Sequence, residues 1–289
     1  MTERIVRSGT ATSRTPAYRT VKSRAALFAA LALTLSYQVA SLGAQATKLN
    51  RDVTPTAGKA PTLRVPAWTK ARLANGADLV VIEKHDLPLV ALTIDFVGGS
   101  SNFDTPDKLG VALMAAQMLS EGTATKTADQ LSDAQQLLGT SINATVGTES
   151  GSIRFTALKD KFEPALALMV DMMLNSTFPD SGLERLRARA LVQLTQARDQ
   201  PNTIALNVFT KTVYGDGHPY GQVVNEKTVR AITRADVMAF NKAYFRPGRA
   251  VITVSGDVNP AAVRVMVEKA LAAWPAGGER PTFAYPMLP

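Results

Sequence analysis

The sequence predicts an α+β fold in which one mostly antiparallel sheet carries helices packed on one face. Three observations predict it. Neighbouring segments alternate apolar and polar residues, as adjacent antiparallel strands do. Segments with helical apolar spacing separate those pairs. The composition of the 289 residues, 46% hydrophobic and 19% charged, is that of a globular chain long enough to bury a sizeable core.

The predicted strands are short apolar segments bounded by turn residues. In chain order they are residues 70–73, 79–83, 89–97, 140–146, 150–158 and 250–257. Asn75-Gly76 predicts the turn between the first two strands. The sequence Gly98-Gly99-Ser100-Ser101 closes the third.

The predicted helices repeat apolar residues at three- and four-residue spacing. They are residues 109–119, 127–138, 162–175, 181–198, 203–214, 228–232, 234–244 and 260–273. Within 162–175 this spacing predicts that Met169 and Met173 pack in the core rather than form a cofactor site. The arginines of 181–198 are expected to form a solvated face, and Pro201 is expected to close that helix.

Residues 1–46 have the features of an export leader. Six basic residues stand against Glu3 alone, and an apolar run over 25–35 leads to Ala44-Gln45-Ala46, the pattern after which signal peptidases cleave. We predict a signal peptide and a bacterial protein that is periplasmic or secreted; the alternative is an uncleaved N-terminal membrane anchor. The run is short for a membrane span, so none is expected after cleavage. A polar, proline-containing linker follows over 47–66.

The net charge of +8 does not indicate nucleic-acid binding. The leader contributes +5 of it, which leaves +3 for all the residues after it. The basic character of the chain therefore belongs mostly to its targeting segment.

The chain offers few groups for catalysis. It has no cysteine and two histidines, which excludes disulfides, thiolate metal sites and cysteine nucleophiles. Ser100-Ser101 has no histidine placed to act as a base. Asp104 and Asp107 are expected to cap a helix start. His85 is expected in an exposed turn, and His218 as a loop or capping residue.

Several short motifs follow one another in a characteristic order. They are Gly110-Val111-Ala112 after the strand and turn of 89–101, Gly122-Thr123, Gly139 with Asn143-Ala144-Thr145, Glu184-Arg185 after Phe178-Pro179, His218-Pro219-Tyr220-Gly221, the helix at 236–245 and Gly256-Asp257-Val258. Together they resemble the insulinase/pitrilysin family of zinc metallopeptidases, the inverted zincins, over residues 66–280. The resemblance implies an N-terminal-type domain of such a peptidase at 67–275 and the start of an interdomain linker at 276–289.

The resemblance fails at the residues that would hold zinc. Active members carry H-x-x-E-H, in which two histidines bind the metal and the glutamate activates water. Aligned on Gly110 and Gly122-Thr123, these positions are Leu113, Ala116 and Gln117, and a third ligand on a later helix maps to Gln193. Leu and Ala have no donor atom, and a Gln amide is a poor zinc ligand. We expect no metal cofactor and no catalysis by this chain alone.

The resemblance implies a non-catalytic pseudo-peptidase subunit or fragment. It would pair with a homologous zinc-bearing subunit, the only place where zinc is expected, and bind and process peptides with it. Asn143, Ala144 and Thr145 match the strand along which substrate lies, and are expected to bind it by main-chain hydrogen bonds; the alternative is a sheet edge without a ligand. For the whole chain the alternatives are an active zinc metalloendopeptidase with unrecognised ligands, and a scaffold or assembly protein of the same fold.

Overall fold

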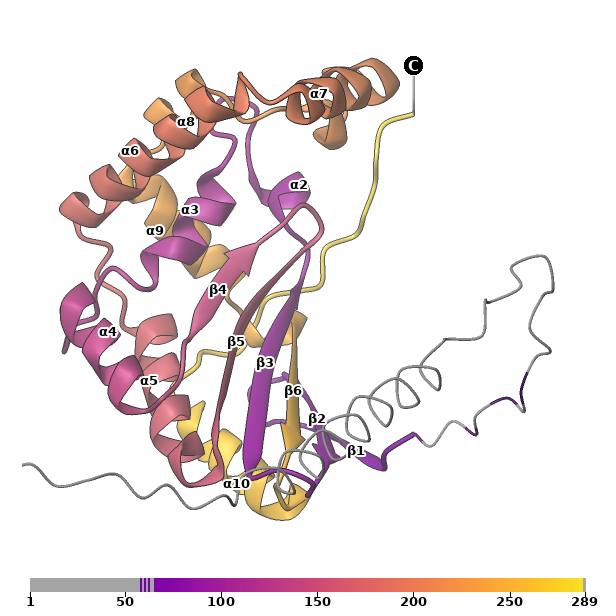
Figure 1. The fold of residues 1–289 in the computed structure, drawn as a ribbon, viewed down its shortest axis with the longest axis vertical. Helices are drawn as coiled ribbons and strands as arrows, with labels where there is room; N and C mark the ends of the chain where they lie inside the picture. Colours follow the sequence, from indigo (N-terminus) through magenta and orange to yellow (C-terminus); the bar gives the residue numbers. More distant parts are fainter. Residues whose placement is uncertain (1–57, 59, 61, 63–64, 288–289) are drawn as a thin grey trace, which may run out of the picture. The chain divides into compact units, whose positions relative to one another are not determined.

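The fold is built on one six-stranded sheet (Figure 1). The computed structural model describes residues 58, 60, 62 and 65–287. The strands are β1 (Trp68–Arg72), β2 (Asp78–Glu83), β3 (Leu89–Val97), β4 (Asn143–Val146), β5 (Ser150–Leu158) and β6 (Ala250–Gly256). They lie in the order β1-β2-β6-β3-β5-β4, and every neighbouring pair is antiparallel except β2 with β6. The predicted fold class is confirmed.

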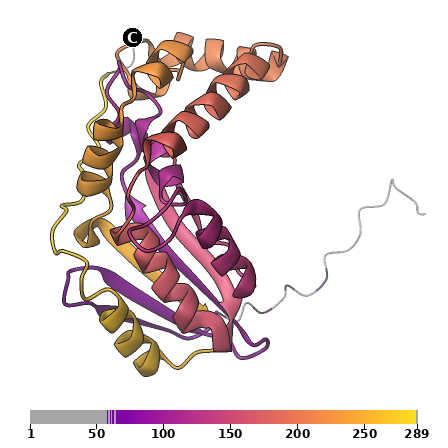
Figure 2. The same cartoon turned by 90° about the vertical axis from the view of Figure 1, so that its left-hand side faces the viewer.

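Apolar side chains gather on one face of this sheet. In β3 the side chains of Val90, Leu92, Ile94 and Phe96 are buried, and those between them are exposed or half-buried. β5 and β6 alternate in the same way. The helices cover the buried face (Figures 1 and 2), so the opposite face meets solvent.

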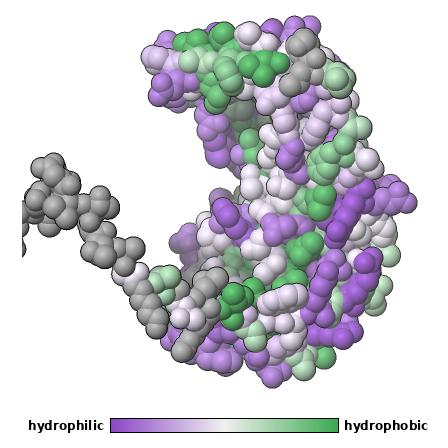
Figure 3. Space-filling view, turned by 90° about the vertical axis from the view of Figure 1, so that its right-hand side faces the viewer, coloured by the Kyte–Doolittle hydropathy of each residue, from purple (hydrophilic) through white to green (hydrophobic). Residues whose placement is uncertain are grey.

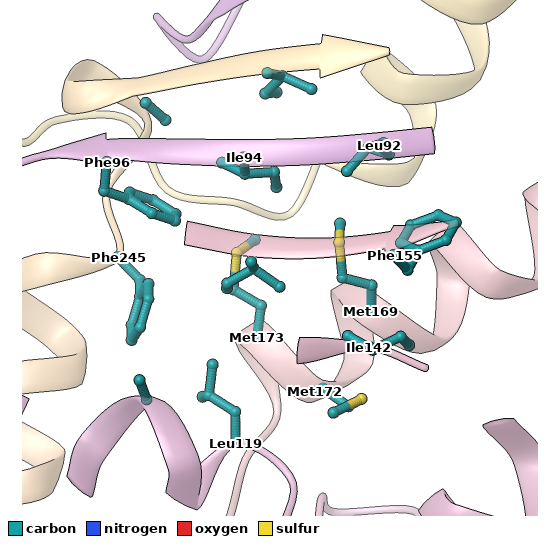
Figure 4. Packing of buried hydrophobic residues seen from close by; sticks show 14 of the residues in the cluster. Leu92, Ile94, Phe96, Leu119, Ile142, Phe155, Met169, Met172, Met173 and Phe245 are labelled. Carbon is teal, nitrogen blue, oxygen red and sulfur yellow. The ribbon is translucent and has the colours of Figure 1, made fainter. Parts of the chain in front are cut away.

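The core lies between the sheet and the helix α5 (Phe162–Leu174). Figure 4 shows Met169 and Met173 pointing from this helix toward the strand residues Leu92, Ile94 and Phe155. Both methionines are buried, as their spacing predicts. Flexible thioether side chains fill the irregular space beneath a twisted sheet.

The remaining helices connect and cover the strands. They are α2 (Ser100–Phe103), α3 (Val111–Met118), α4 (Ala128–Leu137), α6 (Asp180–Ala197), α7 (Pro201–Tyr214), α8 (Glu226–Ala231), α9 (Arg234–Tyr244) and α10 (Pro260–Ala270), with short 3₁₀ turns η1 (Lys159–Lys161), η2 (Pro219–Gly221) and η3 (Pro247–Arg249). Four of them, α4, α8, α9 and α10, begin at a residue whose side chain accepts a main-chain N–H. In α4, Thr127 accepts from the Gln130 N–H, and the Gln130 side chain accepts from the Thr127 N–H. Pro201, expected to close α6, is also the first residue of α7, where its missing N–H has no cost.

The helix α2 is the one described helix that the sequence does not predict. The Ser100 N–H donates to Gly147 O at 2.9 Å and the Ser101 N–H to Thr148 O at 3.0 Å. Gly99 leaves no room for a side chain against the same turn. Contacts with the distant β4–β5 turn therefore form this helix, and no local propensity reveals them.

Helix α7 has no buried residue. Leu206, Val208 and Phe209 are each about 60% exposed. Figure 3 shows hydrophobic residues gathered at the top of the molecule, where α7 lies in Figure 1. A single exposed apolar residue is ordinary, whereas a group of them is typical of surfaces that contact other molecules.

The predicted signal peptide, 1–46, lies outside the described residues, as does most of the linker at 47–66. Within the part of the chain that the structure describes, no helix has both the length and the apolar character to cross a membrane.

Candidate functional site

Helix α3 begins at Gly110, which adopts a left-handed conformation with φ of 100°. The preceding loop brings Asp104 to this start, where its Oδ2 accepts from the Gly110 N–H at 2.7 Å and its Oδ1 from the Ala112 N–H at 3.0 Å. The expected capping role of Asp104 is confirmed. Burial raises the pKa of its carboxyl to about 6, although the two N–H groups act in the opposite direction.

Three of the four positions predicted to match the family's catalytic residues meet at one cavity. Leu113 and Gln117 lie one helical turn apart on α3, and Gln193 faces them from α6; all three line a cavity of about 450 Å³. Ala116 is fully buried and is not part of the lining. Leu113, Gln117 and Gln193, which the sequence motifs align with the family's positions, therefore lie close together in the structure.

The α3–α6 cavity is mainly apolar. Its apolar lining comes from Leu113, Met114, Val146, Leu186, Leu194, Val224 and Val229, with Ala190 and Ala197. Its polar side chains are Ser100, Asp104, Gln117, Thr148, Arg189 and Gln193. A concave apolar site with a few polar groups is typical of a binding pocket.

These residues do not fit a zinc ion. Leu113 offers no donor, the neutral amide oxygens of Gln117 and Gln193 are weak ligands, and the Asp104 carboxylate already accepts two main-chain N–H groups. Among the described residues there is no group of three His, Cys, Asp or Glu that could hold a metal.

Both histidines lie away from the α3–α6 cavity. The His85 Nδ1 lies 2.6 Å from Asp257 Oδ1, beyond the start of β3, whereas the cavity lies near the end of that strand. The His218 Nδ1 accepts from the Tyr220 N–H at 3.1 Å, so it caps the turn η2. His85 is mostly exposed and His218 is buried in its loop. Both placements agree with the sequence expectations.

The strand β4 forms one edge of the sheet beside α3. The Gly147 N–H donates to Ser150 O at 2.8 Å, which makes these two a hydrogen-bonded pair, and such pairs alternate along an antiparallel ladder. Ala144 and Val146 therefore turn their N–H and C=O groups away from β5. No described residue bonds them on that side. Of the predicted substrate residues, Ala144 presents main-chain groups outward, while Asn143 and Thr145 pair with β5.

A second cavity of about 610 Å³ adjoins the first, since both are lined by Ser100, Asp104, Thr148 and Val224. It lies between α2, α7, η2 and the β4–β5 turn. Glu149 at that turn accepts hydrogen bonds from the hydroxyls of Tyr220 and Tyr285. These contacts hold the segment near residue 285 against the hairpin.

One arginine of α6 that was expected on a solvated face lies elsewhere. Arg187 is half-buried and donates to the carbonyl oxygens of Val229 and Ile232. Arg189 is exposed, as expected, and also lines the α3–α6 cavity. The sequence could have indicated that Arg189 lies at the cavity. It stands three residues after Leu186 and four before Gln193, and residues at that spacing share one helix face.

The sheet with its edge strand β4, the helix α3 beside it and the facing helix α6 define an insulinase-type peptidase domain. The chain belongs to this family: the model described as Insulinase (Peptidase family M16) matches residues 79–225, and the one described as Peptidase M16 inactive domain matches residues 231–287.

Two curated relatives indicate how much of a longer protein this chain matches. The "uncharacterized zinc protease YmxG" of Bacillus subtilis is 25% identical over 72% of this chain and 52% of its own length. The "probable mitochondrial-processing peptidase subunit beta" of Schizosaccharomyces pombe is 23% identical over 72% of this chain and 46% of its own length. The chain thus spans about half the length of the curated relatives it matches.

Solved structures agree with this assignment. A peptidase M16 inactive domain from Pseudomonas fluorescens has a TM-score of 0.71 and 27% identity, covering 75% of this chain and 53% of its own. The periplasmic protease PqqL from Escherichia coli has a TM-score of 0.66 and 15% identity, covering 78% of this chain and 26% of its own. The second likeness concerns the fold alone.

Proposed function

We propose that this chain is a non-catalytic, insulinase-like subunit or half that binds peptides and pairs with a zinc-bearing partner. The observation that carries the proposal is the lack of a strong metal donor at the positions aligned with the family's ligands. Leu113 has no donor atom, and Gln117 and Gln193 have only weak amide oxygens. Ala116, at the position of the general base, is buried in the core. A peptidase of this family needs a metal to activate water. In this proposal the partner supplies the metal, and this chain supplies binding surface.

The strand β4 supports the peptide-binding role. Its outward N–H and C=O groups at Ala144 and Val146 can add a strand, because such binding depends on main-chain hydrogen bonds and not on a metal. The neighbouring α3–α6 cavity lies beside this edge.

Two findings support pairing. One of the relatives that the chain matches is named as a subunit. Helix α7 also leaves Leu206, Val208 and Phe209 exposed, and exposed apolar patches are typical of protein contact surfaces. The proposed organisation keeps the insulinase-like domain at 67–275 and an interdomain linker from 276.

Export to the periplasm remains part of the proposal. It rests on the basic and apolar pattern of residues 1–46 and on Ala44-Gln45-Ala46. The similar fold of a periplasmic protease is consistent with it.

Metal content tests the non-catalytic role. The purified chain is incubated with excess zinc, desalted and analysed; we expect less than about a tenth of an equivalent, because no three strong donors converge in the described residues. Close to one equivalent, with peptide cleavage that a chelator stops, would contradict the proposal and make the chain a zinc metalloendopeptidase.

Native mass spectrometry of the chain in a periplasmic extract of its own source tests pairing. We expect a complex with a second chain that contains zinc. If the chain stays alone there, the partner role fails. If it forms a complex that binds no peptide, the scaffold alternative is favoured.

A further inference from the structure

A peptide added to β4 would point its side chains alternately to the two faces of the sheet. On one face Asn143 lines a shallow polar cavity with Thr93 and Arg154. On the other face Val146 lines the α3–α6 cavity. Every second side chain of the peptide therefore points to the face of the sheet that carries the α3–α6 cavity, and the one beside Val146 points toward the cavity.

The surface that such a side chain would meet is apolar and accessible. Leu113 is 43% exposed and Val224 is 39% exposed although both line a concave site. Leu186 and Val229 lie buried behind them. A bulky apolar side chain covering these residues gains roughly 25 cal/mol for each Å² of apolar surface removed from water.

The two charged side chains at the cavity, Asp104 and Arg189, differ in whether they already have hydrogen-bond partners. Both oxygens of Asp104 accept main-chain N–H groups, so this carboxylate is already satisfied. Arg189 lies on an exposed stretch of α6, four residues before Gln193. It has no ion-pair or hydrogen-bond partner among the described residues. The available charge is thus positive, which favours a carboxylate on the ligand and disfavours a basic side chain.

We propose that the α3–α6 cavity, formed where the family's metal ligands would stand, is a pocket for a bulky apolar side chain of a peptide bound along β4, and that Arg189 pairs with a carboxylate on the same peptide. This rests on the proposed peptide-binding role. The pocket exists because Leu113, Gln117 and Gln193 replace groups that would otherwise converge on an ion. The ligand class is an extended peptide with a Leu, Met or Phe and an acidic side chain two residues away, since residues at that spacing point to the same face of a strand.

Binding of labelled Ser/Thr peptides of equal length to the full chain tests the proposal. One carries a Leu and a Glu separated by a single Ser, here called the Leu-Glu peptide. Others replace one of these two residues at the same spacing to give Gly-Glu, Lys-Glu and Leu-Gln peptides, all with amidated C-termini. A fifth ends in Leu with a free carboxylate, which distinguishes an acidic side chain from a chain terminus as the source of the charge. Fluorescence anisotropy should show Leu-Glu binding at least about tenfold more tightly than Gly-Glu or Lys-Glu.

Variants assign the effect to the pocket. Leu113→Glu should weaken Leu-Glu binding about tenfold or more, since it places a charge in the apolar lining. Its control, Leu137→Glu, changes an exposed leucine of α4 outside the cavity and should bind as the wild type does. Arg189→Gln should remove the preference for Leu-Glu over Leu-Gln, whereas Arg264→Gln, on α10, should keep it.

The outcomes separate this proposal from the function on which it rests. If all peptides bind equally and Leu113→Glu changes nothing, the pocket assignment is wrong while peptide binding at β4 stands. If no peptide binds, both the pocket and the peptide-binding role fail. Equal circular dichroism spectra and melting temperatures of Leu113→Glu and Leu137→Glu ensure that lost binding does not reflect lost folding.

Discussion

At the scale of single residues, Asp104 carries a measurable pH dependence. Burial raises the pKa of its carboxyl to about 6, above the ordinary value of an unfolded chain. The folded protein therefore holds this proton more tightly than the unfolded chain does. The contribution of Asp104 to the free energy of unfolding is fully present below about pH 4 and is lost as the pH rises through about 6.

The variant Asp104→Asn should lack this dependence. The difference in unfolding free energy between wild type and variant is expected to fall by as much as about 3 kcal/mol between pH 4 and pH 7, measured by urea denaturation. Asp107→Asn is the control, because that exposed carboxyl has a lowered pKa through its hydrogen bond from Thr105. A flat difference for Asp104→Asn would contradict the burial of this charge.

The lining of the α3–α6 cavity indicates which substitutions should create a metal site. The triple variant Leu113→His, Gln117→His and Gln193→Glu places two imidazoles and a carboxylate around one cavity, and should bind close to one equivalent of zinc. Ala116 is left unchanged because it is fully buried, so the variant gains a metal without the family's general base and should cleave peptides poorly. Leu113→His alone should bind no zinc after desalting; if the triple variant also binds none, these positions do not converge as the structure places them.

At the scale of elements, β4 allows a proline test of its free edge. Ala144 points its N–H away from β5, so Ala144→Pro should keep the ladder and the melting temperature while abolishing peptide binding. Thr145 is paired with Ser152 in the ladder, and Thr145→Pro should cost about 1–3 kcal/mol of unfolding free energy because it removes a ladder hydrogen bond. Equal destabilisation by the two prolines would contradict this assignment, and greater destabilisation by Ala144→Pro would mean that the ladder alternates in the opposite sense.

The sequence predicts most elements because their signals are local. The alternating apolar residues of β3 and the helical methionine spacing of α5 appear at the bounds expected within a residue or two. The sequence does not predict helix α2, because main-chain hydrogen bonds with the β4–β5 turn form it. It does not predict the half-buried position of Arg187 either, because the acceptors of this side chain, Val229 O and Ile232 O, lie far along the chain.

The candidate site also has a part that the sequence predicts and a part that only the structure shows. The family resemblance indicates Leu113, Gln117 and Gln193, since its motifs fix the matching position on each helix. The strand order, the outward groups of Ala144 and the role of Arg189 in the cavity follow only from the packing of α3, α6 and β4. Long-range contacts of this kind leave no periodic signal in a single sequence.

At the scale of the whole molecule, Trp274 joins the last helix to the sheet. It is 1% exposed, its indole N–H donates to Phe245 O at 2.9 Å, and its ring meets Phe96 edge to face. Trp274→Ala should cost about 3–5 kcal/mol, measured by thermal or chemical unfolding. Trp68→Ala, at an exposed position on the edge strand β1, is the matched control and should cost less than about 1 kcal/mol.

The position of β6 determines when the six-stranded sheet can be completed. β6 lies between β2 and β3, yet it is made after every other strand. Until residue 256 leaves the ribosome, the β1–β2 hairpin has no sheet to join and β3 keeps one edge unpaired. Completion of the sheet therefore depends on a long-range insertion, and contacts of this kind form slowly in general. A chain that ended before β6 would be left with two separate pieces of sheet, β1–β2 and β3–β5–β4.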